Sequence, residues 1–215
     1  MEALDNIRNR IHAAATRANR DPQSVTLIAV TKTVPPNRIR EAAACGVRNV
    51  GENRLQEAIS KIDDLSDLGL TWHFIGHIQT NKAKKVAERF EWIHSVDRTD
   101  VADKLGLAAV KPLSVLIEVK LHEEPGKSGA ALLELPALID VIRRHEKLKL
   151  KGLMAVPPFL ENPEEVRPYF RQLRNIAALY ELPELSMGMT HDFEVAIEEG
   201  ATMVRIGTGL FGSRK

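Results

Sequence analysis

Lys32 is the first residue in the sequence whose type and surroundings could do chemistry. It follows residues 27–31, five apolar or small residues in the order Leu-Ile-Ala-Val-Thr. Partial desolvation lowers the cost of keeping a lysine amine neutral, and a neutral amine can attack an aldehyde to form a Schiff base. The run alone is also compatible with a strand that simply emerges into water at Lys32.

Two segments of small residues could bind a phosphate. Ser186 and Gly188 lie in one segment, and Gly207 and Thr208 lie in the other. Small residues let backbone N–H groups approach phosphate oxygens, and hydroxyl groups add further donors. Each glycine on its own could instead be a turn residue that needs a positive φ. The coincidence of the two segments predicts an anion site.

Arg205 is a charged residue on an otherwise apolar segment, residues 203–206. An inward-facing arginine in a protein core needs a partner, because an unpaired buried charge is strongly unfavourable. A pyridine nitrogen is one candidate partner, and a carboxylate such as Glu52 or Asp97 is another. The residues alone leave both candidates open, together with a purely structural ion pair.

Short β-branched runs alternate with longer segments of helical period, a pattern typical of strand–helix units around a parallel sheet. Eight strands with intervening helices predict one α/β domain over residues 1–215, a single (β/α)8 TIM barrel, with an extra N-terminal amphipathic helix over 3–19. The expected strands are 25–32, 47–53, 71–77, 92–97, 113–121, 148–157, 185–190 and 203–211. The expected helices are 38–45, 54–65, 82–90, 101–109, 132–147, 163–180 and 193–199.

In such a barrel the strand-to-helix loops gather at one end, so polar residues at the carboxyl ends of the strands face a common site. This rule brings Lys32, the two small-residue segments and Arg205 together. Residues 123–129 would form a loop at the same end, either a gate for ligand entry or a simple connector. An open doubly wound sheet is the alternative fold, but its Gly-x-Gly-x-x-Gly nucleotide turn is missing after the first strand.

Composition and charge exclude several classes of protein. The 215 residues include 30 Lys and Arg against 29 Asp and Glu, a net charge of +1, so we expect neither nucleic acid nor a membrane as partner. No apolar stretch approaches the ~18 residues of a membrane helix, and the N-terminus has no secretory pattern, so we expect a cytoplasmic protein. The single cysteine, Cys45, excludes an intrachain disulfide, and we expect it to be a small buried residue.

No metal site is expected. With the alternation of a strand, His73 and His77 would share one face of the sheet, but no third ligand has a recognisable metal spacing. Tyr169 and Tyr180 fall in the long helix after the sixth strand, among residues with core spacing. We expect both tyrosines to be packing or surface residues.

Six segments of the sequence point together to one known family. They are 29–32 (Ala-Val-Thr-Lys), 50–54 (Val-Gly-Glu-Asn-Arg), 72–82 (Trp-His-Phe-Ile-Gly-His-Ile-Gln-Thr-Asn-Lys), 152–154 (Gly-Leu-Met), 185–190 (Leu-Ser-Met-Gly-Met-Thr) and 204–208 (Val-Arg-Ile-Gly-Thr). In combination they resemble the pyridoxal phosphate homeostasis protein family. The resemblance implies a barrel like the N-terminal domain of alanine racemase that binds pyridoxal 5′-phosphate on a lysine.

The resemblance assigns four residues to the ring of that cofactor. Lys32 would hold it covalently as a Schiff base, and Asn53 would lie beside the ring or its O3′ atom. Met154 would pack near the ring, and Arg205 would face the pyridine nitrogen. Because an arginine stays protonated and donates to that nitrogen, the nitrogen stays largely unprotonated and the ring is a weaker electron sink than one that faces aspartate.

The resemblance assigns four further residues to the phosphate. Ser186, Gly207 and Thr208 would hold it, and Gly188 would assist through a close approach of its backbone. Thr190 departs from the family pattern, since many relatives carry serine there. Threonine keeps the hydroxyl group, so we still expect binding.

The expected function is homeostasis of pyridoxal phosphate rather than catalysis. The racemase-like enzymes use a second acid–base group, a tyrosine from an extra β domain, and we expect that domain to be missing here. The protein would be a monomer that stores the cofactor or hands it to apoenzymes that depend on it, and so affects amino-acid and keto-acid balance indirectly. One alternative is a slow amino-acid racemase that uses the cofactor. A lower-ranked alternative is a barrel enzyme in which Lys32 forms a Schiff base with a sugar phosphate.

Overall fold

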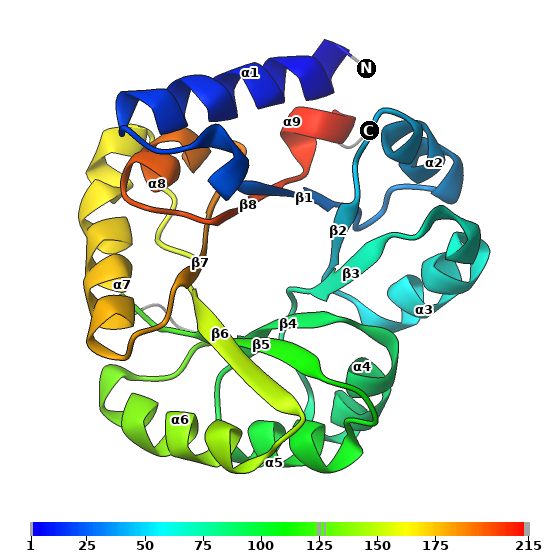
Figure 1. Cartoon of the computed structure of the whole chain (residues 1–215), viewed down its shortest axis with the longest axis vertical. Coiled ribbons are helices and arrows are strands. Elements are labelled where there is room, and N and C mark those ends of the chain that lie inside the picture. Colours follow the sequence, from blue (N-terminus) through cyan, green and yellow to red (C-terminus); the bar gives the residue numbers. More distant parts are fainter. Residues whose placement is uncertain (1, 124–125, 127, 213–215) are drawn as a thin grey trace.

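The computed structural model describes residues 2–123, 126 and 128–212, and within them eight parallel strands close into a barrel in chain order. Pairing of β8 with β1 closes the ring, which Figure 1 shows along the barrel axis. The strands are β1 (Thr26–Val30), β2 (Asn49–Glu52), β3 (Thr71–Phe74), β4 (Trp92–Val96), β5 (Leu113–Glu118), β6 (Leu148–Met154), β7 (Glu184–Met189) and β8 (Met203–Ile206). The predicted (β/α)8 barrel is confirmed.

Helices surround the barrel and connect each strand to the next. They are α1 (Glu2–Arg17), α2 (Pro36–Ala44), α3 (Leu55–Asp64), α4 (Ala83–Arg89), α5 (Thr99–Ala108), α6 (Leu135–Arg144), α7 (Arg167–Leu179), α8 (Phe193–Glu198) and α9 (Thr208–Phe211). The expected helices over 132–147 and 163–180 begin instead with single 3₁₀ turns, at Leu132–Glu134 and Pro163–Val166. No helix of the described residues is long and apolar enough to cross a membrane.

The expected strand over 203–211 is wrong in its second half. The strand ends at Ile206, and Gly207, with φ −110° and ψ −81°, turns the chain into the short helix α9. Leu210 of that helix is buried, with 2% of its surface exposed. The apolar run that suggested a long strand therefore combines strand residues with a helix that packs on the outside of the barrel.

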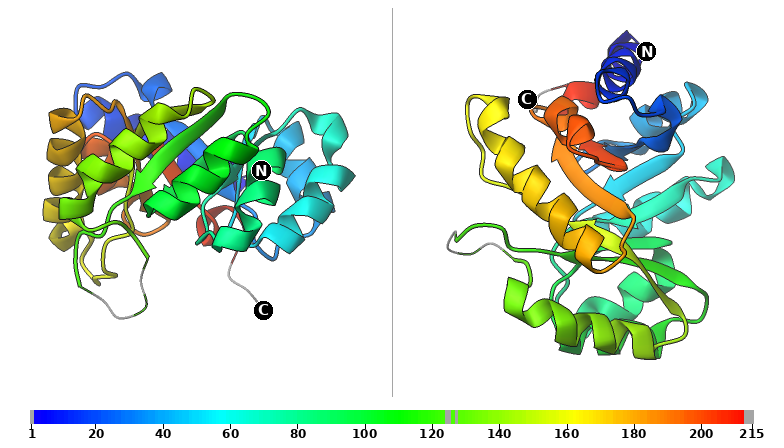
Figure 2. Two further views of the ribbon diagram at one scale, coloured as in Figure 1. Left: turned by 90° about the horizontal axis from the view of Figure 1, so that it is seen from below. Right: turned by 60° about the vertical axis from the view of Figure 1, so that its left-hand side comes forward.

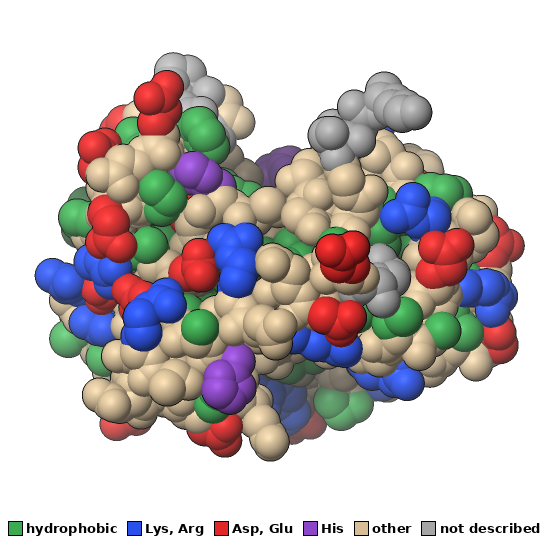
Figure 3. Space-filling view, turned by 90° about the horizontal axis from the view of Figure 1, so that it is seen from above, with side chains coloured by type: hydrophobic (Ala, Val, Ile, Leu, Met, Phe, Trp, Pro, Cys, Tyr) green, Lys and Arg blue, Asp and Glu red, His purple; other side chains and the backbone are tan. Residues whose placement is uncertain are grey.

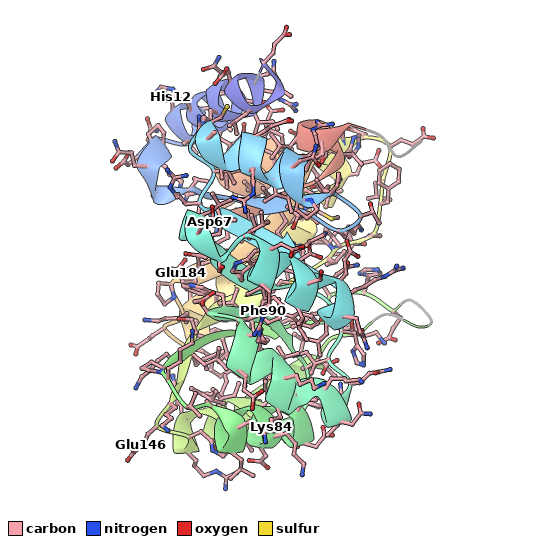
Figure 4. All side chains as sticks on the ribbon, turned by 90° about the vertical axis from the view of Figure 1, so that its right-hand side faces the viewer. His12, Asp67, Lys84, Phe90, Glu146 and Glu184 are labelled. Carbon is pink, nitrogen blue, oxygen red and sulfur yellow. The ribbon has the colours of Figure 1, made fainter. Side chains whose placement is uncertain are left out.

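Two apolar layers hold the barrel. A small cluster of Ile28, Leu116, Met154 and Met203 lies in the barrel interior. A larger layer lies between the sheet and the helices, and Figure 4 shows Phe90 within it, at the end of α4. The interior holds few apolar side chains, because polar residues occupy much of it, as described below.

The helix α1 confirms the expected N-terminal amphipathic helix. Leu4, Ile7, Ile11 and Ala14 are buried along one face, at the three- and four-residue spacing of a helix. On the adjoining face, the guanidinium of Arg10 lies 4.6 Å from the centre of the Phe193 ring in α8. The helix thus covers the side of the barrel formed by α8 and α9 (Figure 1).

Two expectations about single residues are wrong. Cys45 is exposed, because it follows the last residue of α2 at the helix end that faces solvent. His73 is buried in the barrel, whereas β3 ends at Phe74 and leaves His77 half-exposed in the next segment, so the two histidines do not share a sheet face. Within the described residues no group of three side chains could hold a metal ion.

Candidate functional site

The carboxyl ends of the strands form one face of the barrel, and this face is hollowed at its centre, as the upper edge of Figure 3 shows. In Figure 2 the chain leaves the end of β5 on the same face. The expected loop over 123–129 falls partly outside the described residues. Lys32, Asn53 and Thr208 follow the ends of β1, β2 and β8, so the structure brings them to this face as expected.

Lys32 is partly exposed, and its amine makes no hydrogen bond or ion pair with any described residue. Along β1, Ile28 points into the barrel, and the alternation of a strand continues this inward series through Val30 to Lys32. Thr31 points the other way, toward α3, where its carbonyl oxygen accepts a hydrogen bond from Lys61. Lys32 therefore offers an unpaired amine at the barrel mouth.

Asn53 offers an unpaired acceptor. Its Oδ1 atom is buried and has no hydrogen-bond partner among the described groups. A buried acceptor without a partner costs free energy, so such an atom is poised to receive a donor from a ligand. Met154 lies lower, with 1% of its surface exposed, in the apolar cluster that closes the barrel interior beneath the mouth.

Arg205 is buried in the barrel interior, and its partners are neither of the carboxylates considered from the sequence. Its Nη1 atom donates to Ser186 Oγ at 2.7 Å, and its Nη2 atom donates to the carbonyl oxygen of Ala155 at 3.0 Å. Glu52 instead pairs with Lys61, and Asp97 pairs with Arg98. Burial lowers the pKa of Arg205 to about 10, against the opposing charges of Glu118 and Asp192, so the guanidinium stays charged at neutral pH.

A chain of buried side chains continues from Arg205 across the barrel. Ser186 Oγ lies 2.8 Å from His94 Nδ1, His94 Nε2 lies 2.9 Å from His73 Nδ1, and His73 Nε2 lies 3.0 Å from Asn49 Oδ1. One placement of protons satisfies every contact. Ser186 accepts from Arg205 and donates to His94, which donates to His73, which donates to Asn49.

This proton placement requires both histidines to be neutral. Burial lowers the pKa of His73 to about 3. Burial, followed by the charges of His73 and Arg205, also lowers the pKa of His94. Arg205 is then the one charged member of the chain, and the neutral groups behind it fix its orientation.

The expectation that Ser186 holds a phosphate does not fit its position. Ser186 lies in the middle of β7, where it pairs with Met154 and Met203 of the neighbouring strands, and its side chain is fully buried. Its hydroxyl group is occupied by Arg205 and His94. The hydroxyl therefore lies inside the barrel, below the level at which the loops could surround an anion.

Thr190, unlike Ser186, places its hydroxyl group at the carboxyl end of β7. It directly follows the last residue of β7, and its Oγ1 atom accepts from the N–H of Gly209 and from the Thr208 hydroxyl, each at 3.3 Å. From the sequence, Thr190 is a departure from the family pattern that keeps the hydroxyl group, but it is not among the residues expected to hold the phosphate. The available signal was its place immediately after a strand end.

The glycines of the two segments have different roles. Gly188 has φ +90°, and a Cβ atom there would lie 2.6 Å from the Cβ of Ala196, so this position serves the packing of α8 on β7. A Cβ atom on Gly209 would lie 2.9 Å from Thr190 Cγ2. Gly207 has more room, with Val30 as the nearest neighbour at 3.5 Å. The close approach expected of Gly188 is thus toward α8, whereas Gly209 approaches Thr190.

Glu118 is a buried carboxyl group at the end of β5 that the sequence did not single out. The Ser128 hydroxyl group lies 3.2 Å from its Oε1 and 3.3 Å from its Oε2. Burial, with the charge of Asp97, raises the pKa of Glu118 to about 7, against the hydrogen bond from Ser128 and the charge of Arg205. Glu118 and Ser128 line a pocket with Lys120, His122 and Val156.

The two tyrosines pack as expected. Tyr169 and Tyr180 are partly buried against the apolar layer outside the sheet. The Tyr169 ring meets the His122 ring edge to face, with the ring centres 5.9 Å apart.

Comparison with known proteins gives a consistent family assignment. The family model of the alanine racemase N-terminal domain matches residues 3–215. A pyridoxal phosphate homeostasis protein of Aquifex aeolicus is 48% identical over 100% of this chain and 98% of its own length. Proteins of the same name from Pseudomonas aeruginosa and Escherichia coli K12 are 46% and 43% identical, over 99% and 98% of this chain and 95% of each relative.

Solved structures agree with these relatives. PipY of Synechococcus elongatus with pyridoxal phosphate bound has a TM-score of 0.84 and 40% identity, and it covers 96% of this chain and 100% of PipY. Alanine racemase of Corynebacterium glutamicum, with a TM-score of 0.69 and 17% identity over 98% of this chain and 62% of the racemase, shares the fold alone. The chain belongs to the pyridoxal phosphate homeostasis protein family.

Proposed function

We propose that this protein binds pyridoxal 5′-phosphate, holds it covalently on Lys32 and serves the homeostasis of this cofactor rather than catalysis. The unpaired Lys32 amine at the barrel mouth carries the proposal, since the nearby Lys61 is buried and engaged by two carboxylates. The names of the relatives and the cofactor bound in PipY support it. When bound, the cofactor supplies an aldehyde that condenses with a lysine amine.

The residues around Lys32 fit the other parts of the cofactor. Asn53 Oδ1 is a buried acceptor without a partner, suited to a donor beside the ring. Arg205 donates hydrogen bonds to Ser186 and Ala155, and its remaining N–H groups can donate to a ring nitrogen. Met154 supplies an apolar floor. We propose these three residues as ring contacts.

The phosphate would lie at the turn from β8 into α9. Gly207, Thr208 and Gly209 offer backbone N–H groups there, and Thr190 and Thr208 add hydroxyl groups. In this proposal Ser186 serves the phosphate only indirectly, by fixing Arg205, and Gly188 serves by letting α8 pack against the strand that precedes Thr190.

We further propose that the protein acts as a monomer in the cytoplasm and passes its cofactor to apoenzymes. A partly exposed lysine suits this role, because a bound aldehyde must be reachable by water or by a second amine to be released. Arg205 supports a non-catalytic role, since a donor that stays charged at neutral pH keeps the ring nitrogen from gaining a proton and weakens the ring as an electron sink.

A slow racemase-like activity remains the second candidate, and Glu118 is the observation that favours it. In a closed barrel of eight strands, β5 lies opposite β1, so Glu118 stands across the mouth from Lys32. A carboxyl group with a pKa of about 7 is suited to giving and taking protons at neutral pH.

The first prediction concerns Lys32. Replacement of Lys32→Ala should abolish the yellow absorption of the protein after incubation with pyridoxal phosphate, because the covalent anchor is lost. Borohydride should fix the cofactor on the wild type and on the exposed-lysine control Lys84→Ala, but not on Lys32→Ala. A Lys32→Ala protein that is still fixed by borohydride would place the anchor on another lysine.

The second prediction separates the phosphate from the ring. Thr190→Val should weaken binding of pyridoxal phosphate about tenfold through lost hydrogen bonds, and should leave binding of pyridoxal almost unchanged. Absorption titration with both compounds measures this ratio. The control Thr16→Val removes a hydroxyl that bonds only to a carbonyl of its own helix. An equal loss for both compounds would remove Thr190 from the phosphate site.

The third prediction distinguishes the two candidate functions. If the protein is not an enzyme, exchange of the α-hydrogen of amino acids for deuterium should not exceed the rate with free pyridoxal phosphate. Nuclear magnetic resonance of a panel of amino acids in D₂O measures this. Faster exchange that is lost in Glu118→Gln would establish the racemase-like alternative instead.

The fourth prediction follows from the raised pKa of Glu118. The folded protein holds this proton up to about pH 7, whereas the unfolded chain releases it near the ordinary glutamate pKa of 4.5, so ionisation destabilises the fold as pH rises between these values. Relative to the wild type, Glu118→Gln should therefore gain about 2 kcal/mol of unfolding free energy between pH 5 and pH 8.5. Denaturant unfolding measures the gain, which should be absent in the exposed control Glu146→Gln.

A further inference from the structure

We propose that Lys61, Glu52 and Glu57 are positioning residues that hold the main chain on both sides of Lys32. This inference rests on the proposed role of Lys32 as the cofactor lysine. None of the three residues faces the barrel mouth as Lys32 does. They lie in the layer between β2 and α3, behind the turn that follows β1.

On the N-terminal side of Lys32, the network holds Thr31 through two different groups. Lys61 Nζ donates to the carbonyl oxygen of Thr31 at 2.6 Å. The hydroxyl group of Thr31 donates to Glu52 Oε1 at 2.7 Å, and the same oxygen accepts from Lys61 at 2.8 Å. Both the backbone and the side chain of Thr31 are therefore fixed from outside the barrel.

On the C-terminal side, the network holds Thr33. The backbone N–H of Thr33 donates to Glu57 Oε1 at 2.5 Å, and this oxygen also accepts from Lys61 at 2.6 Å. Thr33 has φ +63°, in the left-handed region that β-branched residues rarely adopt. Such a conformation persists where the surrounding structure over-determines it, and the Glu57 carboxylate provides that constraint.

The cost of this network indicates a purpose other than stability. The side chains of Glu52 and Lys61 are 0% and 8% exposed, and the Oε2 atom of Glu52 has no partner among the described groups. A buried ion pair seldom stabilises a fold more than apolar residues of the same size would, because both charges lose their water. This ion pair instead fixes the conformation of the turn. The Lys61 ammonium group bonds to both carboxylates, and these bond to the residues before and after Lys32.

The electrostatics of Glu57 agree with this arrangement. Its partial burial acts to raise its pKa, but the hydrogen bonds from Lys61 and Thr33 outweigh burial and leave the pKa below the ordinary value. Glu57 is thus ionised at neutral pH, which suits a carboxylate that accepts hydrogen bonds from the Lys61 ammonium group and from the Thr33 backbone N–H.

The experiment compares three variants on the same helix. Glu57→Ala removes the acceptor of Thr33, whereas Glu57→Gln keeps an Oε1 atom that can accept from both donors. Asp63→Ala is the matched control, because it also removes a carboxylate of α3, one that pairs with Arg89 rather than with the turn. Two quantities are measured: backbone hydrogen exchange over residues 31–34 without cofactor, and the dissociation constant for pyridoxal phosphate by absorption titration.

Glu57→Ala should exchange faster over residues 31–34 and bind pyridoxal phosphate about tenfold more weakly, the effect of losing one strong hydrogen bond. Glu57→Gln should restore both quantities to within about twofold, because the same contacts can form. Asp63→Ala should match the wild type in both. Rescue by glutamine distinguishes positioning from a general loss of stability.

Two results would overturn the inference: unchanged exchange over residues 31–34 in Glu57→Ala, or equal weakening of cofactor binding in Glu57→Ala and Asp63→Ala. A wild type that takes up no pyridoxal phosphate would instead remove the proposed function. In that case the exchange measurement still decides whether Glu57 holds the turn.

Discussion

The charge of Arg205 inside the barrel is the constraint on which the rest of the interior depends. A guanidinium removed from water must have its donors satisfied, and here Ser186 and the Ala155 carbonyl satisfy part of them. Ser186 can accept from Arg205 only by passing its own proton onward, which fixes the tautomers of His94 and then His73. Each hydrogen bond in this series of buried side chains therefore has a fixed donor and a fixed acceptor. The charged end of the series, Arg205, lies toward the carboxyl ends of the strands.

On the outer side of the barrel, a second set of contacts fixes the main chain beside Lys32. Alternation along β1 sends Lys32 toward the mouth and Thr31 toward α3, so whatever fixes Thr31 also fixes the starting point of the Lys32 side chain. The hydrogen-bonded side chains inside the barrel and the ion pairs outside it share no described contact. The first set orients the Arg205 guanidinium in the interior, and the second holds the main chain beside Lys32.

Sequence reasoning identified the barrel because strand and helix periods alternate along the whole chain, and the rule of strand ends located Lys32, Asn53 and Thr208 at one face. Sequence reasoning misplaced residues where their position depends on the register in which neighbouring strands pair. Ser186 and Thr190 are only four residues apart. The pairing of β7 with its neighbours shows that Ser186 lies inside the barrel, whereas Thr190 follows the end of the strand at the rim. The partnership of Lys61 with Glu52 was equally hidden, because it joins a helix to a strand through contacts that no local pattern marks.

The same geometry bears on the proposal that this barrel, whose fold is shared with alanine racemase, holds a cofactor without catalysing a reaction. Proton transfer on both sides of a reacting carbon needs two groups that face each other across it. Lys32 follows the end of β1, and Glu118 is the last residue of β5, which lies opposite β1 in the closed barrel. Its proton is retained up to about pH 7 by burial and by the charge of Asp97, and Ser128 holds its carboxyl group from the side. Arg205 is buried and stays charged at neutral pH. In the function proposed above it would donate to the ring nitrogen of the cofactor and weaken the ring as an electron sink, which is the physical reason for proposing storage and release rather than turnover.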